Sequence, residues 1–136
     1  MRFVFDENFS RHLAEGLDLL EKSNPGRIIQ VDIISAEGLM GRRGATDPEL
    51  IKAAGPDGVV FTKDKDFKQI KLYAPVIEAT GAKVLFYKYS KKMILFWDIL
   101  TETVARWEEI KEKMSRPKPP FVYEFDIRAG VSERHF

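Results

Sequence analysis

Residues 58–66 read Gly-Val-Val-Phe-Thr-Lys-Asp-Lys-Asp. Their apolar run is unbroken, which is typical of a short strand buried on both faces in a parallel sheet. We expect the strand to end at Thr62, so that Asp64 and Asp66 follow its carboxyl end. An apolar strand followed directly by acidic residues therefore indicates both the fold and the place to look for a site.

Three further apolar runs predict the other strands, at residues 2–5, 28–34 and 84–87. The segments between the strands carry apolar residues at helical spacing. This spacing predicts helices over about residues 9–22 and 48–54, and two short helices or turns at residues 67–73 and 75–80. Strands that alternate with helices form a parallel sheet with right-handed crossovers. The predicted fold class is therefore α/β, a three-layer α/β/α sandwich around a central, mostly parallel sheet.

The helix starts have recognisable caps in the sequence. We expect Asn8 to cap the first helix, and Asp47 to cap the second with Pro48 in its first turn. The polar, glycine-rich segment 35–46 is expected to be a loop. Residues 92–114 carry a long apolar stripe and predict one continuous helix.

We divide the chain into a domain of residues 1–116 and a C-terminal extension of residues 117–136. Three prolines, Pro117, Pro119 and Pro120, predict a stiff linker at the start of the extension. Residues 121–127 alternate apolar with polar side chains, which predicts a half-buried strand. This strand is expected to pair with the edge of the sheet or with another chain.

Length and composition narrow the function classes. The 136 residues fit one domain, and the 22 basic and 21 acidic residues give a net charge of only +1. The chain has no cysteine, which excludes disulfides, thiolate metal sites and cysteine nucleophiles. It has no signal-peptide pattern at its start and no run of roughly 18 apolar residues. We therefore expect a soluble, cytoplasmic protein without a membrane partner.

Acidic residues form three clusters, at residues 6–8, 47–49 and 64–66. Asp6 and Asp64 follow like ends of two predicted parallel strands, and ligands of open α/β sheets bind at that edge. Carboxylates that meet there repel one another unless a cation neutralises them or their pKa values shift. Oxygen ligands without cysteine favour Mg²⁺ or Mn²⁺. Asn8 and Thr62 are neutral candidates beside the acids, whereas His12 and His135 are given no role.

Each of these residues also has a structural interpretation. A single aspartate after a strand is more often a turn or cap residue, and capping would account for Asp47 equally well. Basic residues flank the acidic clusters, namely Arg42, Arg43, Lys63 and Lys65. They could bind the phosphates of a polyanion, or they could form an ordinary solvated surface.

Three segments together carry a family resemblance. They read Phe-Val-Phe-Asp6-Glu7-Asn8-Phe-Ser10, Gly41-Arg-Arg-Gly-Ala-Thr46-Asp47-Pro-Glu49 and Val-Val-Phe-Thr62-Lys-Asp64-Lys-Asp66-Phe67. In this order they resemble the signature segments of PIN-like domains, over about residues 1–88. The Asp-Glu-Asn opening is most similar to VapC-type toxins of toxin–antitoxin modules.

The resemblance implies an α/β sandwich and a Mg²⁺- or Mn²⁺-dependent ribonuclease. It implies catalytic and metal-binding roles for Asp6, Asp64 and Asp66, and it leaves Asp47 and Glu49 as alternatives for the middle acid, of which we favour Asp47. The sequence departs from the commoner pattern, which has a glutamate well inside a helix. The extension after Met114 lies outside the matched segments.

The functional hypothesis is a metal-dependent endoribonuclease, the toxin of a toxin–antitoxin module, in which a metal-activated water cleaves RNA. In it Asp6, Asp47, Asp64 and Asp66 are the catalytic residues. Its expected partners are RNA, a cognate antitoxin and a second copy of the chain. One alternative is a receiver-like phosphoacceptor domain, in which Asp6, Glu7, Asp64 and Lys88 would take part. The other alternative is a PIN-like binding module without activity.

Overall fold

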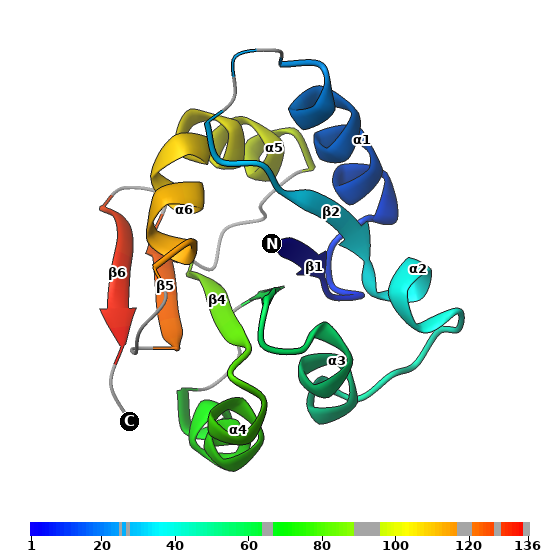
Figure 1. The fold of residues 1–136 in the computed structure, drawn as a ribbon, viewed down its shortest axis with the longest axis vertical. Coiled ribbons are helices and arrows are strands. Elements are labelled where there is room, and N and C mark those ends of the chain that lie inside the picture. The colour runs from blue at the N-terminus through cyan, green and yellow to red at the C-terminus, as the bar shows by residue number, and fades with distance from the viewer. Residues whose placement is uncertain are drawn as a thin grey trace.

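The computed structural model describes residues 1–24, 26, 28–63, 67–88, 96–116, 121–126 and 129–134, with the backbone alone for 67–70. One six-stranded sheet crosses this part of the chain (Figure 1). Its strands are β1 (Arg2–Phe5), β2 (Asp32–Ser35), β3 (Gly58–Lys63), β4 (Lys83–Lys88), β5 (Val122–Asp126) and β6 (Gly130–Arg134). Their order is β2-β1-β3-β4-β5-β6, and every neighbouring pair is parallel except β5 with β6.

Helices cover both faces of the sheet (Figure 1). One face packs against α1 (Arg11–Lys22), α5 (Phe96–Ala105) and α6 (Trp107–Met114). The other face packs against α2 (Ala36–Met40), α3 (Asp47–Ala54) and α4 (Phe67–Thr80). The α/β class and the three-layer sandwich predicted from the sequence are therefore confirmed.

The two faces have different cores because successive strand residues point to opposite sides. Phe3, Phe5 and Phe61 face α1, and the rings of Phe5 and Phe61 stack with centroids 4.5 Å apart. Val4 and Val60 face the opposite way, among the apolar side chains of α3 and α4. Each central strand is thus buried on both faces, as its continuous apolar sequence predicts.

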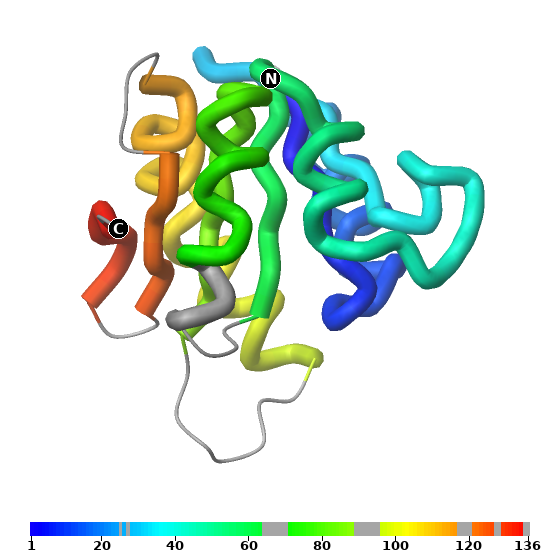
Figure 2. The backbone as a smooth tube through the Cα atoms, turned by 90° about the horizontal axis from the view of Figure 1, so that it is seen from below, coloured from blue at the N-terminus to red at the C-terminus, as the bar shows by residue number. Residues whose placement is uncertain are grey.

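The direction in which successive strands are added to the sheet reverses between β1 and β3. From β1 it passes through α1 to β2 on one side, and then returns through α2 and α3 to β3 on the other side. The carboxyl ends of β1 and β3 therefore lie side by side, at the lower edge of the sheet in Figure 2. In doubly wound sheets such a switch point is where ligands bind.

Several elements differ from those predicted. Ser10, not Asn8, caps α1, since its hydroxyl accepts from the His12 amide at 3.2 Å. The second strand begins at Asp32, and Ile28 is 95% exposed. The expected loop at 35–46 contains α2, a short helix whose N-cap is Ser35. Sequence periodicity did not reveal α2, since one turn of helix is too short to show it.

The helices expected at 67–73 and 75–80 are one helix, α4, which continues through Pro75. Proline removes one backbone hydrogen bond, but Tyr73, Val76 and Ile77 pack against the sheet and hold the helix together. The helix expected at 92–114 is interrupted at Arg106, whose backbone is not helical, and gives α5 and α6 with different directions (Figure 1). Its first residues, 92–95, lie outside the described residues.

The C-terminal residues extend the sheet. β5 pairs in parallel with β4, with Val84 opposite Val122, and β6 turns back along β5. The sequence did not predict β6, but its Arg134 makes two hydrogen bonds to Glu124, one of them 2.9 Å long. The predicted proline linker lies outside the described residues. In the described part of the chain, no helix combines the length and apolar character that a membrane crossing requires.

Candidate active site

Asp6 occupies the carboxyl end of β1 at the switch point. Its amide continues the strand ladder by donating to the carbonyl of Phe61 at 2.9 Å, and its side chain is only 4% exposed. The carboxylate accepts from the Asn8 amide at 2.9 Å and from Asn8 Nδ2 at 3.3 Å. Burial raises the pKa of Asp6, although these hydrogen bonds act in the opposite direction.

Asp47 is the first residue of α3, but it does not cap the helix. The cap is Thr46, whose hydroxyl accepts from the amide of Glu49 at 3.3 Å, so the predicted capping role of Asp47 is wrong. The Asp47 carboxylate instead faces the sheet. Its negative charge contributes to the raised pKa of Asp6, and Asp47 lines a small, mostly apolar cavity together with Tyr73 of α4.

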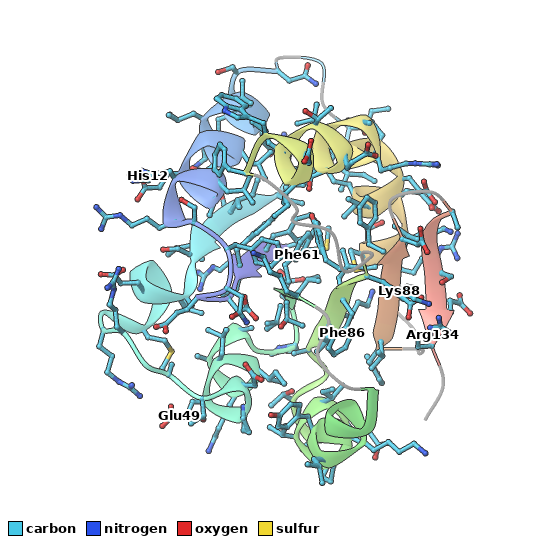
Figure 3. The ribbon with its side chains drawn as sticks, turned by 180° about the vertical axis from the view of Figure 1, so that it is seen from behind. His12, Glu49, Phe61, Phe86, Lys88 and Arg134 are labelled. Atoms are coloured by element: carbon cyan, nitrogen blue, oxygen red, sulfur yellow. The ribbon has the colours of Figure 1, made fainter. Side chains whose placement is uncertain are left out.

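Glu49 is held in a different arrangement. Its Oε2 accepts from the Thr46 amide at 2.8 Å, which completes a capping box, and from Arg42 Nη2 at 3.2 Å. The hydrogen bond from the Thr46 backbone, followed by that from Arg42, lowers the pKa of Glu49. Figure 3 shows Glu49 on the outer side of α3. The structure therefore brings Asp47 towards Asp6 and leaves Glu49 at the start of its own helix.

A cleft of about 480 Å³ opens beside Asp6, between the start of α1 and the start of α2. Its lining combines this acid and two glutamates, Glu7 and Glu37, with polar and basic side chains from Ser10, Arg11, Ser35 and Arg43. His12 is at its rim, 72% exposed and 3.6 Å from Glu15, on the outer side of α1 (Figure 3). The cleft is large enough for a nucleotide-sized group.

The expected basic residues have different surroundings. Arg43 lines the cleft, where its Nε lies 3.3 Å from Glu37. Arg42 lies against Glu49 instead. Lys63, at the end of β3, places its Nζ 5.5 Å from the ring centre of Phe9, which also lines the cleft. Lys65 lies outside the described residues.

Asp64 and Asp66 also lie outside the described residues. In the described ranges, no group of three or more histidine, cysteine, aspartate or glutamate side chains is placed to hold a metal ion. The described donors at the switch point are Asp6, Asp47, Asn8 and Thr62, all of which offer oxygen atoms. Two carboxylates with neutral oxygen donors at one edge of the sheet fit a hard divalent cation such as Mg²⁺ or Mn²⁺.

Two residues near the acids were not expected from the sequence. Arg11 lines the cleft from the first position of α1, and Tyr73 of α4 lines a small cavity together with Asp47. A basic residue directly after the Ser10 cap was one available signal for Arg11. For Tyr73 the only signal was its helical spacing with Ile77, which indicates the buried face of a helix and no particular partner.

Comparison with known proteins adds one finding. A family model described as a PIN-like domain matches residues 1–89, which is more than half of the chain and contains all three acidic clusters. No curated protein and no solved structure matches the chain. The match ends just after β4 and so includes both strands of the switch point. It confirms the resemblance seen in the three sequence segments, and the chain belongs to the PIN-like domain family.

Proposed function

We propose that this protein is a metal-dependent endoribonuclease with its active site at the carboxyl ends of β1 and β3. PIN-like domains are commonly nucleases, which supports a nuclease-type activity. The observation that carries the proposal is Asp6, a buried carboxylate on the wall of a cleft at the switch point, whose pKa is raised by burial and, to a smaller degree, by the charge of Asp47. A buried carboxylate with a raised pKa beside a cleft is characteristic of a functional site.

In this proposal Asp6 and Asp47 hold a divalent cation together with Asp64 and Asp66. Asn8 fixes the orientation of the Asp6 carboxylate through its hydrogen bonds, and Thr62 is a further oxygen donor beside it. Mg²⁺ or Mn²⁺ bound by these oxygens would neutralise charge on a phosphodiester and acidify a water molecule. Glu49 has no part in the site, because it closes the capping box of α3.

RNA phosphates would lie in the cleft beside Asp6. Arg43 and Arg11 line that cleft, and Lys63 is near its Phe9 wall. Such contacts make binding depend on salt concentration, because each phosphate that is neutralised releases counterions. Arg42, which lies outside this lining, and Lys65, which is not among the described residues, complete the proposed set of RNA contacts.

Cleavage of a labelled single-stranded RNA in Mg²⁺ and in Mn²⁺ tests the assignment. We expect Asp6→Asn and Asp47→Asn each to slow cleavage by about 100-fold or more, since each removes charge from the site. Glu49→Gln should cleave at nearly the wild-type rate, because glutamine can still accept in the capping box. EDTA should abolish the activity.

Asp57→Asn is a matched control for the two aspartate variants. Asp57 precedes β3 at the opposite end of the sheet, is 88% exposed, and pairs only with the amino group of Met1 among the residues described. We expect this variant to cleave like the wild type. Cleavage by Asp6→Asn at the wild-type rate would show that the acidic pair is not the active site.

The toxin role is a further part of the proposal and rests on the Asp6-Glu7-Asn8 opening. Its expected partner is a cognate antitoxin that blocks the site. Induced expression in a bacterial host should arrest growth, and the Asp6→Asn variant should not. Continued growth with an active wild-type enzyme would remove the toxin role and leave the nuclease assignment intact.

The two alternatives receive less support. A receiver-like domain needs a free lysine beside its acids, but Lys88 Nζ lies 3.6 Å from Glu124 of β5, and Figure 3 shows Lys88 on the side of the sheet where Arg134 of β6 lies. An inactive binding module would bind RNA or metal without cutting. The same RNA assay separates this alternative from an enzyme.

A further inference from the structure

We propose that Glu37 is a positioning residue that holds the side chain of Arg43 in place to bind a backbone phosphate of RNA. This inference rests on the proposed function, because it takes the cleft beside Asp6 as the place where RNA binds. It gives a role to α2, a helix that none of the acidic clusters includes. Three observations carry it.

The first observation is an ion pair on the wall of the cleft. Arg43 Nε donates to Glu37 Oε2 at 3.3 Å, and both side chains line the cleft that contains Asp6. Glu37 lies in the first turn of α2, whose start is fixed by the Ser35 hydroxyl, which accepts from the Gly38 amide at 3.0 Å. The Arg43 side chain is 81% exposed, whereas that of Glu37 is 35% exposed. The pair therefore joins an exposed arginine to a carboxylate that a helix holds.

The second observation is that the backbone is held on both sides of Arg43. Before it, the Gly41 amide donates to the carbonyl oxygen of Glu37 at 2.9 Å and ends α2. After it, the Gly44 amide donates to Glu7 Oε1 at 2.6 Å. An exposed ion pair by itself contributes little to ordering two long side chains. Here the backbone of the arginine is already held, so that Glu37 has only the side chain to orient.

The third observation is the unpaired end of the Arg43 guanidinium group. Its Nε is used by Glu37, while Nη1 and Nη2 have no partner among the described residues. These two nitrogens form a planar fork that matches two oxygens of a phosphate. Arg42 differs, since its Nη2 lies 3.2 Å from Glu49 Oε2 and it does not line the cleft. Of the two adjacent arginines, Arg43 thus offers its fork to a phosphate in the cleft.

Glu37→Ala and Glu37→Gln separate positioning from charge. Both remove a negative charge from the cleft, which favours RNA binding, but only glutamine keeps an acceptor for Arg43 Nε. Fluorescence anisotropy of a labelled single-stranded RNA in EDTA measures binding without cleavage. We expect Glu37→Ala to weaken binding by about fivefold, because RNA must then order the Arg43 side chain, and Glu37→Gln to bind at least as tightly as the wild type. Glu49→Gln is the matched control and should bind like the wild type, since Glu49 pairs with the neighbouring Arg42.

A second measurement tests whether Glu37 acts through Arg43. We expect Arg43→Ala to weaken RNA binding by about tenfold, because a charged hydrogen bond to phosphate is lost. It should also reduce the slope of log affinity against log salt by about 0.7, the value for one phosphate of a single strand. A role in folding alone would not change this slope. In the Arg43→Ala background, Glu37→Ala should weaken binding no further, which completes a double-mutant cycle.

The outcomes separate the two proposals. If the variants bind RNA as expected but the wild type does not cleave it in Mg²⁺ or Mn²⁺, the nuclease assignment fails and the role of Glu37 stands. If the wild type cleaves RNA but Glu37→Ala binds it as tightly as Glu37→Gln, the positioning role is overturned and the nuclease assignment stands. An unchanged salt slope in Arg43→Ala, or a wild type that binds no RNA in EDTA, also overturns the positioning role, because Arg43 would then hold no phosphate.

Discussion

The Glu7 carboxylate accepts a hydrogen bond from the amide of Gly44, with Oε1 2.6 Å from the nitrogen. The two residues are far apart in the chain, one directly after β1 and the other just before α3. Gly44 has a φ of +81°, a left-handed conformation that glycine adopts without strain. The contact ties the segment that leads into Asp47 to the segment that carries Asp6.

We expect Glu7→Ala to lower the rate of RNA cleavage by roughly tenfold, because small displacements of catalytic groups are costly. Glu7→Gln keeps an acceptor for the Gly44 amide and should retain most of the activity. Steady-state kinetics of the two variants on one RNA substrate provide the comparison. Equal rates for alanine and glutamine at this position would show that the contact does not organise the site.

The sequence was sufficient to predict the layers and the place of Asp6, since both depend on local patterns. Continuous apolar strands such as residues 59–61 bury both faces, and the aspartate directly after β1 then lies at the edge of the sheet. It was not sufficient for the choice between Asp47 and Glu49. That choice depends on which residue caps α3. The cap is Thr46, one residue before the expected Asp47, so the capping box uses Glu49 and leaves Asp47 to face the sheet.

Long-range pairings were the other gap. The pairing of β6 with β5 and the cavity that Tyr73 and Asp47 line together join distant segments through tertiary structure, and no local periodicity contains this information. The interruption at Arg106 has the same origin, because the apolar stripe continues through it. Local patterns thus predicted the elements, whereas their contacts required the fold.

Stability should depend on pH through Asp6. Burial raises its pKa above the unfolded value, so the folded state holds this proton more tightly than the unfolded state does. Below the unfolded pKa of 3.8 the Asp6 carboxyl is protonated in both states, and its raised pKa then does not lower the free energy of unfolding. As pH rises through the interval up to the folded pKa, the unfolded state ionises first and stability is lost.

Asp6→Asn removes this penalty. We therefore expect the metal-free variant to be more stable than the wild type at pH 7, with the difference shrinking as pH falls below about 4. Thermal unfolding in EDTA at several pH values measures it. A variant that is less stable than the wild type at pH 7 would contradict a raised pKa of the buried Asp6 carboxyl in the folded state.

A buried ion pair between Glu21 and Lys111 links α1 to α6. Lys111 Nζ lies 2.8 Å from Glu21 Oε1, and their side chains are 0% and 2% exposed. Trp107 Nε1 donates to the same oxygen at 3.3 Å. We expect Lys111→Met to reduce the free energy of unfolding by about 3–5 kcal/mol, because the buried Glu21 charge then loses the lysine that neutralises it.

Replacing both members of the pair should restore most of that loss. In a Glu21→Leu, Lys111→Met double variant no charge remains to be desolvated, and apolar replacements of this kind are often neutral or stabilising. The exposed pair of Asp18 and Lys22 is the control, and Lys22→Met should cost less than about 1 kcal/mol. Urea unfolding of the four proteins decides, and a double variant as unstable as Lys111→Met would exclude this explanation.

Two glycines should respond oppositely to alanine. Gly58 begins β3, and a Cβ there would lie 2.3 Å from the carbonyl oxygen of Ala54, a backbone atom that cannot move without shifting the end of α3. Gly16 is inside α1, and a Cβ there would meet nothing within 4 Å.

We expect Gly58→Ala to destabilise the protein by more than about 2 kcal/mol through backbone displacement. Gly16→Ala should stabilise it by about 0.5–1 kcal/mol, because alanine loses less conformational freedom in a helix. Unfolding midpoints of both variants test this contrast, and a neutral Gly58→Ala would show that α3 and β3 are not packed as closely as the structure has them. Because α3 carries Asp47, the shift of α3 in Gly58→Ala should also make this variant cleave RNA more slowly than Gly16→Ala.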